Sequence, residues 1–426
     1  MKKRKQMTQI IASIIIVGSN INPVHAENLE QAWEMMLKYD HSLKAISQAT
    51  AAAGLQLESA KAARLPNIVL GTRYSSLDNA PAVKSSFGSF QAGEKSSLSY
   101  NATVSLPIYT SGKITQTIAA NDALFQASKA QISSTVLNLK LQLAESYIAV
   151  LRGVQALIVA NSHIVSLQAH ELDVRNMFEQ GMVPNNDLLA ASVSLSNAQQ
   201  EKIKVSNNLD IARSSFNQLL GRPLYQEVDI EELKPEQITI SLIKLTEKAI
   251  QQRDELHSLQ EQIKSLHHQS ESIQAEIGPQ VTLNGGYDYQ ENKFTAHEDQ
   301  WSINLGVQWK IFDAGLIRNK AGATTLQAMA AQEQYEDLTN RIALQVRQYW
   351  LDVQETKKRL LVTEKAIEQA EENLKVNRNR YENGLSTNTE VIDAENLRTL
   401  SQNNHVNGIY DAVLAAIRLK YATGEL

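Results

Sequence analysis

Glu390 and Asp393 are two acidic residues three positions apart, close enough for their carboxylates to act together. Residues three positions apart lie on the same face of a helix, about one turn from each other. Such a pair can attract a cation, or it can complement the positive end of a helix dipole. From these two residues alone, the favoured interpretation is a solvated helix face or a helix N-terminus.

No other set of residues predicts a reaction centre. His267 and His268 are adjacent and point to different faces of a helix, and no carboxylate or thiol cluster completes a metal shell around them. The sequence has no Gly-rich phosphate loop, nucleophile elbow or metalloprotease motif. The many other acidic residues follow polar helix faces, where solvated charge is the default. We therefore expect no enzyme activity, no cofactor and no metal site.

The stretch that carries the two carboxylates occurs twice in the chain. In residues 381–395 a charged helical pattern is interrupted by Gly384, and residues 178–190 have Gly181 at the matching position 203 residues earlier. Helices often end on a glycine in the left-handed conformation. Both stretches are therefore predicted to be tips of helical hairpins.

The two predicted tips differ in their acidic residues. With the same offset, Asp187 matches Glu390, whereas Ala190 stands where the second copy has Asp393. Other anchors keep the 203-residue spacing, so the chain is predicted to be an internal duplication. These anchors are the pairs Gly112/Gly315, Tyr147/Trp350 and Gly221/Gly424.

Long helices with a seven-residue repeat must position the tips. A strict heptad gives a left-handed supercoil. Residues 113–180 contain no proline, so they predict one helix of about 100 Å, too long for a single globular domain. The alanines beside the repeat favour close packing in a coiled bundle. The repeat in the second half consists of Val346, Val353, Leu360, Ile367, Leu374 and Tyr381.

Between the helices the hydrophobic period changes to two. Alternating segments of about ten residues with aromatic residues near their ends are typical of transmembrane barrel strands. Four strands are predicted, at about 66–76, 97–109, 279–289 and 300–312. Tyr100, Trp301 and Trp309 are the predicted membrane-interface aromatics. From the strands alone, a soluble sandwich is the alternative.

Four strands cannot close a barrel, because the smallest known barrels have about eight. An open sheet edge is not tolerated in a bilayer, so several chains are predicted to share one barrel. The polar connections 75–97 and 290–300 are predicted to be loops at its outer mouth.

Residues 1–26 have the pattern of a signal peptide, with a basic start, a short apolar core and Ala26 before the cleavage point. We found no other apolar run of about 20 residues, which argues against a helical inner-membrane protein. Removing these residues takes away four positive charges and changes the net charge from −5 to −9. That acidity argues against nucleic acid as a partner. The chain has no cysteine, so neither a disulfide framework nor a lipid-bearing cysteine is expected.

The order of elements resembles the TolC-type outer membrane efflux proteins over essentially the whole mature chain. The most specific matches are residues 380–384 with Asp393 and Ala394, and residues 178–187 with Ala190. The resemblance implies an α/β membrane protein in which a homotrimer forms a twelve-stranded β-barrel, continued by a coiled-coil tunnel. The internal duplication divides the mature chain into a first repeat at 27–221, a linker or equatorial segment at 222–240 and a second repeat at 241–426.

The same resemblance implies roles for residues at the tips. Glu390 and Asp393 match a gate of acidic rings around the tunnel axis. Tyr381 and Asp187 match a closed-state latch in which Ser386 takes the place of the family's arginine. The residues that match the adaptor-docking turns are Gly181, Met182, Gly384 and Leu385.

The sequence leaves three candidate functions for the protein. The resemblance implies the outer-membrane exit duct of a tripartite efflux pump or type I secretion system in a Gram-negative bacterium. Its partners would be outer-membrane lipid, a periplasmic adaptor and an inner-membrane transporter of the RND, ABC or MFS type. The alternatives are a non-transporting coiled-coil scaffold of the envelope and a secreted enzyme.

Overall fold

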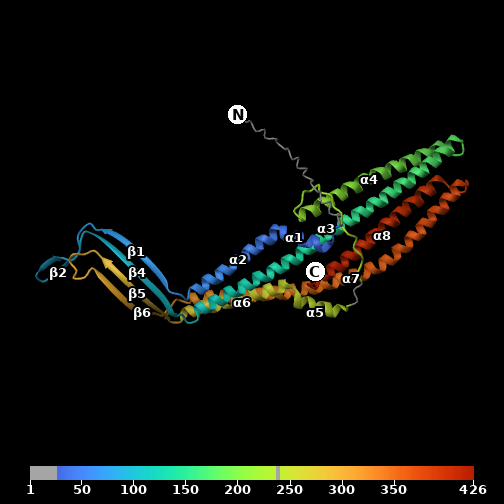
Figure 1. Cartoon of the computed structure of the whole chain (residues 1–426). Coiled ribbons are helices and arrows are strands. Elements are labelled where there is room, and N and C mark those ends of the chain that lie inside the picture. Colours follow the sequence, from blue (N-terminus) through green and yellow to red (C-terminus); the bar gives the residue numbers. More distant parts are fainter. Residues whose placement is uncertain (1–25, 237–239) are drawn as a thin grey trace, which may run out of the picture.

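The computed structural model describes residues 26–236 and 240–426. The predicted signal peptide therefore lies outside the described residues, except for Ala26. The chain is elongated, with a curved sheet at one end and two helical hairpins reaching the other end (Figure 1). The helices are α1 Leu29–Tyr39, α2 His41–Ala62, α3 Lys113–Glu179, α4 Asn185–Leu219, α5 Leu242–Gln252, α6 Asp254–Gln274, α7 Leu316–Glu382 and α8 Asn388–Ala422, with a short 3₁₀ turn at Ala275–Ile277. The strands are β1 Asn67–Ser76, β2 Ala82–Ser85, β3 Gly88–Gln91, β4 Ser96–Tyr109, β5 Gln280–Gln290 and β6 Asp299–Gln308.

The long helices α3 and α7 have 67 residues each, and α4 and α8, which follow them, have 35 each. At 1.5 Å per residue, α3 and α7 are each about 100 Å long. In the half nearer the sheet, α3 packs against α2 and α6, and α7 packs against α5 and α6. In the other half α3 packs against α4 and α8, while α7 packs against α8 (Figure 1).

The apolar core is divided into separate clusters along this length. The largest lies near the middle of the molecule, where Tyr147 and Phe216 meet edge to face with their ring centroids 5.8 Å apart. It joins α1, α3, α4 and α8. A second cluster joins α5, α6, α7 and α8 around Ile342 and Val346. A third holds the two tips together.

Helix α3 contains an 18-residue stretch with a mean hydropathy of 1.5, and among the described residues it is the one helix apolar enough to cross a membrane by length and composition. The expectation that no such run follows the signal peptide was therefore too strict. Leu143, Tyr147 and Val150 of α3 are buried in the central cluster, whereas Ile158 and Val165 further along the helix are exposed.

Four strands form one antiparallel sheet in the order β1-β4-β5-β6. The central pair, β4 and β5, joins the two halves of the sequence, and Tyr100 stacks on Tyr289 across it at 4.8 Å. Within the described residues, β1 and β6 pair on one side only and leave both edges of the sheet open.

Two details differ from the predicted strands and loops. The connection after β1 was predicted as a loop, but it contains the hairpin β2–β3, in which Val83 pairs with Phe90. Strand β6 ends at Gln308, whereas the alternation predicted a strand to about residue 312. Its partner β5 begins at Gln280, directly after Pro279, and a proline has no N–H to extend the ladder.

Candidate functional site

Both tips are closed by the same backbone turn. Gly181 (φ 73°) and Gly384 (φ 71°) follow the ends of α3 and α7. The N–H of the next residue donates to the carbonyl five positions back, from Met182 to Met177 and from Leu385 to Arg380, at 2.9 and 2.8 Å. Glycine adopts this left-handed backbone without the steric cost of a Cβ, which explains the residue type at both turns.

The side chains beyond the two glycines are exposed at the end of the molecule. Met182 and Leu385 each follow the glycine of their turn and are more than half exposed. The structure therefore places both predicted docking residues at the far end of the helical hairpins.

An apolar cluster holds the two hairpins together behind the turns. It includes Val174 on α3, Ala191 on α4, and Val391 and Ala394 on α8. Tyr381 on α7 is buried in the same cluster. The two predicted tips therefore form one packed unit.

Glu390 begins the second helix of its tip as well as carrying a predicted gate charge. Its carboxylate accepts hydrogen bonds from the N–H of Thr387, at 3.0 Å, and from the Ser386 hydroxyl, while the Thr387 hydroxyl accepts from the Glu390 N–H. This reciprocal arrangement is a capping box. The hydrogen bond from Ser386, followed by that from Thr387, lowers the pKa of Glu390. The carboxylate is therefore ionised at neutral pH.

Asp393 lies one turn further along α8, and its side chain is exposed. Glu390 is exposed as well, so the structure places both predicted gate carboxylates on the surface of the second tip. The hydroxyl of Ser386, the residue predicted to replace a latch arginine, donates to Glu390.

Tyr381 and Asp187 lie near each other but are not hydrogen-bonded within the chain. The Tyr381 hydroxyl is buried and has no hydrogen-bond partner among the described residues. Burial, and after it the negative charge of Asp187, raise the pKa of Tyr381. The predicted latch pair is therefore close in space without a direct bond.

Asn388 links the two tips instead. Its Nδ2 donates to the backbone carbonyl of Asp187 at 2.9 Å, and its Oδ1 lies 2.7 Å from Nε2 of His170. The His170 ring meets the Tyr381 ring edge to face at 5.6 Å. Burial lowers the pKa of His170, against a smaller opposing effect of the hydrogen bond with Asn388.

A buried carboxylate lies further from the tip, where α3, α7 and α8 meet. Glu395 is 1% exposed, and its oxygens lie 2.5 Å from Nη2 of Arg398 and 3.3 Å from Nη2 of Arg378. It also accepts from the Ser166 hydroxyl at 2.6 Å and lies 3.2 Å from Nδ1 of His163. Burial raises the pKa of Glu395, but the hydrogen bonds of His163 and Ser166 and the charges of Arg398 and Arg378 together hold it below its ordinary value.

The sequence interpretation did not single out His170, Asn388 or Glu395. For His170 a signal was present, because it lies three residues after the buried Leu167 and four before the buried Val174. A polar residue at core spacing indicates a buried hydrogen bond. The partners of Glu395 come from three helices, and no spacing in one helix shows them.

Two hairpins of very long helices, joined to a small sheet with open edges, are the architecture of an outer-membrane channel protein. The sequence matches the outer membrane efflux protein family over residues 33–222 and 245–425, and the chain belongs to that family. Its members are channel proteins of the Gram-negative outer membrane.

Several known proteins are similar to the chain. Outer membrane protein TolC of Vibrio cholerae serotype O1 is 23% identical over 423 residues, which are 96% of this chain and 93% of that protein. The TolC of Escherichia coli strain K12 is 21% identical over 301 residues, which are 67% of this chain and 61% of that protein.

Solved structures share the fold. VceC of Vibrio cholerae has a TM-score of 0.82 at 18% identity, covering 93% of this chain and 96% of that chain. The outer-membrane channel OprN also has a TM-score of 0.82, at 16% identity, covering 93% of this chain and 90% of that chain.

Proposed function

We propose that the chain is the outer-membrane exit duct of a tripartite efflux pump or type I secretion system, and that it acts as a passive homotrimer without a catalytic role or cofactor. One observation carries the proposal: the strand register places apolar side chains on one face of the sheet and polar side chains on the other. Across the four strands, Leu70 pairs with Ala102, Ala102 with Tyr287, and Tyr287 with Trp301.

The opposite face of the sheet carries a second, polar row. Gly71 pairs with Asn101, and Asn101 pairs with Asp288, which pairs with Gln300. A sheet that is apolar on one face and polar on the other suits a barrel wall between lipid and a water-filled lumen. Tyr100 and Trp301 belong to the apolar face, and Trp309 follows the end of β6 nearer the helices. We assign these three residues to the two membrane interfaces.

Open edges support assembly from several copies. With β1 and β6 each unpaired on one side, β1 of one copy is free to pair with β6 of the next, and three copies give twelve strands. On α3, Ile158, Val165 and Leu172 are exposed at seven-residue spacing. This row is suited to helix packing between copies.

Three copies around an axis bring the exposed carboxylates of the second tip together. Glu390 and Asp393 then form two acidic rings, which favour cations over anions. The Tyr381 hydroxyl, which is buried and has no hydrogen-bond partner in the described part of one chain, supports a latch that Asp187 completes when the trimer closes. The exposed Met182 and Leu385, with Gly181 and Gly384, are the proposed contact with a periplasmic adaptor, through which an inner-membrane transporter of the RND, ABC or MFS type delivers the cargo.

The proposal is tested with the purified mature protein in detergent and in planar bilayers. We expect trimers that resist dodecyl sulfate until heated, and pores that prefer cations. Tyr381→Phe, which removes the hydroxyl alone, should raise the conductance of the closed channel. A monomer that forms no pores contradicts the duct and favours a non-transporting coiled-coil scaffold. If the natural chain forms cation-preferring pores and Tyr381→Phe has the same conductance, the latch is contradicted but the duct is not.

A further inference from the structure

Glu27 follows directly after the predicted cleavage point at Ala26. Chain ends are usually poorly ordered unless contacts hold them. The backbone of Glu27 is held on both sides: its N–H donates to the Asp229 carbonyl and its own carbonyl accepts from the Glu231 N–H, each at 3.0 Å. These bonds form a parallel bridge to Ile230 in the linker between the two halves of the chain.

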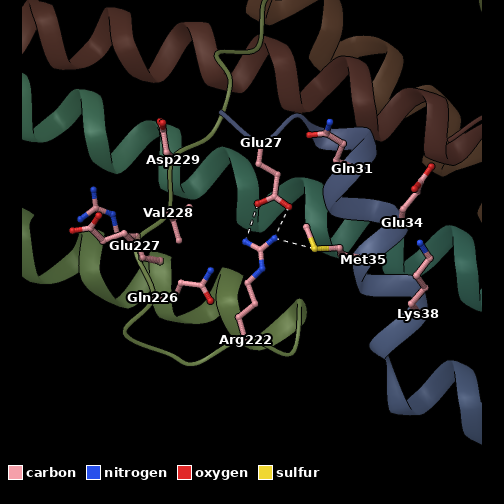
Figure 2. A pocket seen from close by; sticks show the side chains of 11 residues that line it. Glu27, Gln31, Glu34, Met35, Lys38, Arg222, Gln226, Glu227, Val228 and Asp229 are labelled. Carbon is pink, nitrogen blue, oxygen red and sulfur yellow. Dashed lines mark hydrogen bonds and ion pairs between the residues drawn. The ribbon is translucent and has the colours of Figure 1, made fainter. Parts of the chain in front are cut away.

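The side chain of Glu27 is fixed as firmly as its backbone. Arg222 donates to both carboxylate oxygens, from Nη1 at 2.9 Å and from Nη2 at 2.7 Å. Figure 2 shows the carboxylate and the guanidinium facing each other, with the Met35 sulfur beside them. Two parallel charge-assisted hydrogen bonds fix orientation as well as distance. The first residue after the cleavage point is therefore a structural element.

Glu27 lies in a predominantly acidic part of the molecule. It lines an open pocket of about 1100 Å³ between α1, the end of α4 and the linker. Behind it, the Tyr147 hydroxyl on α3 lies 2.8 Å from the Glu27 carbonyl oxygen and 2.7 Å from that of Glu231. Burial, and to a smaller degree the charges of Glu231, Glu27 and Glu232, raise the pKa of Tyr147 above its usual range.

Charged groups line the pocket or act on the Tyr147 hydroxyl behind it. The carboxylates outnumber the cations by six to three. The carboxylates are Glu27, Glu34, Glu227, Asp229, Glu231 and Glu232, and the cations are Lys38, Arg213 and Arg222.

We propose that this site binds the chain's own α-ammonium group, which is created when the signal peptide is removed. A signal peptidase hydrolyses the Ala26–Glu27 bond with one water molecule, leaving a carboxylate on Ala26 and an amine on Glu27 that takes up a proton. A free α-amino group has a pKa of about 8 and is charged at neutral pH. The neutral N–H···O bond to Asp229 becomes charge-assisted, and the acidic site gains a positive charge.

Removal of the signal peptide would then stabilise the folded protein. The linker and α1 reach full stability only after the signal peptide has been cleaved, so release of the chain and completion of its central region are coupled.

The first test measures the reactivity of the N-terminus in the native protein. N-terminal sequencing should begin at Glu27, and an amine-specific reagent should label its α-amino group at least about tenfold more slowly in the folded protein than in denaturant, a difference of about 1.4 kcal/mol. Equal labelling rates, or a different first residue, would overturn the proposal.

The second test moves the ammonium away from the site. A Ser-Gly insertion between Ala26 and Glu27 keeps every side chain of the site, while the same insertion between Phe87 and Gly88 in the exposed turn of β2–β3 is the matched control. A group that gains stability when protonated has a raised folded-state pKa, so its contribution is present below about pH 8 and is lost as the pH rises. We expect the first insertion alone to lower the unfolding midpoint at pH 7, and this gap to close towards pH 10. A gap that is absent, or the same at both pH values, would contradict a bound ammonium.

Discussion

Nε2 of His170 on α3 lies 2.7 Å from Oδ1 of Asn388 on α8, and this contact joins the two helical hairpins just behind their tips. Because the Asn388 Nδ2 donates to the Asp187 carbonyl, its Oδ1 must accept, so His170 Nε2 carries the proton. One asparagine therefore binds a side chain from α3 and the backbone at the start of α4.

Asn388→Ala should loosen the closed tip. It leaves the buried His170 ring without its partner, at a cost of about 1–3 kcal/mol, and it also removes the part-buried bond to the Asp187 carbonyl. We expect a lower unfolding midpoint and a higher conductance of the closed pore in bilayers. The control is Gln369→Ala, at an exposed position of α7. Equal conductance of the two variants would show that the link does not hold the tip.

Removing the charge of Glu395 should be more costly. Glu395→Gln keeps the shape of the side chain but leaves Arg378 and Arg398 without their carboxylate, and breaking a buried pair on one side costs about 3–5 kcal/mol. The measurement is chemical denaturation, with Glu382→Gln as the control at an exposed position. A loss no larger than that of Glu382→Gln would show that the cluster is structurally unimportant.

The ion pairs of Glu395 also predict that the stability of the protein depends on pH in the acidic range. The folded-state pKa of Glu395 is lowered, so its contribution is present above its unfolded pKa of about 4.3 and is lost as the pH falls through the folded value. The gap in stability between the natural chain and Glu395→Gln should therefore narrow below about pH 4. A gap that stays constant down to pH 3 would contradict the lowered pKa.

His170 predicts a change in a milder pH range. Its folded-state pKa is lowered by burial, so protonation favours the unfolded state, and stability should fall as the pH drops below the unfolded pKa of about 6.5. The charged groups that act on it are Arg378, Asp173 and Glu395. In His170→Gln, which keeps a hydrogen-bond donor, the fall between pH 6.5 and 5 should be smaller. If the natural chain and His170→Gln lose stability identically between pH 6.5 and 5, His170 is not the source of that loss.

The gate carboxylates are predicted to set ion preference with little effect on stability. Glu390→Gln keeps the capping box, because the glutamine side-chain oxygen can accept the same bond from the Thr387 N–H. Combined with Asp393→Asn, it should reduce the preference of the pore for cations in reversal-potential measurements. Glu179→Gln, at the exposed end of α3, is the control. If the double variant keeps the full preference, the selectivity lies elsewhere in the tunnel.

Much of the architecture follows from periodicity. Heptads without proline predicted a helix over 113–180, and α3 extends from Lys113 to Glu179. Alternating side chains predicted four strand segments because each strand of this sheet has one apolar face. The hairpin β2–β3 was missed, since its strands have only four residues each and contain serine and lysine.

The turns at the tips could also be predicted from the sequence. Gly181 and Gly384 ended two helical patterns at matching positions, and a left-handed backbone explains that residue type. The hydrogen-bond partners of the tip residues could not be predicted from the sequence. Tyr381 and Asp187 were predicted as a latch, whereas within the chain Asn388 makes the hydrogen bonds.

Helix lengths, the alternation of the strands and the positions of the turns could be predicted from the sequence, because each depends on residues close together in the chain. Tertiary structure was needed to show which strand faces form one apolar surface, since a register shift of one residue would move every side chain of a strand to the other face. It also decided the surroundings of Glu395 and Glu27, whose partners come from distant segments. Their contacts depend on how the helices and the linker are placed against each other, and no local pattern encodes that placement.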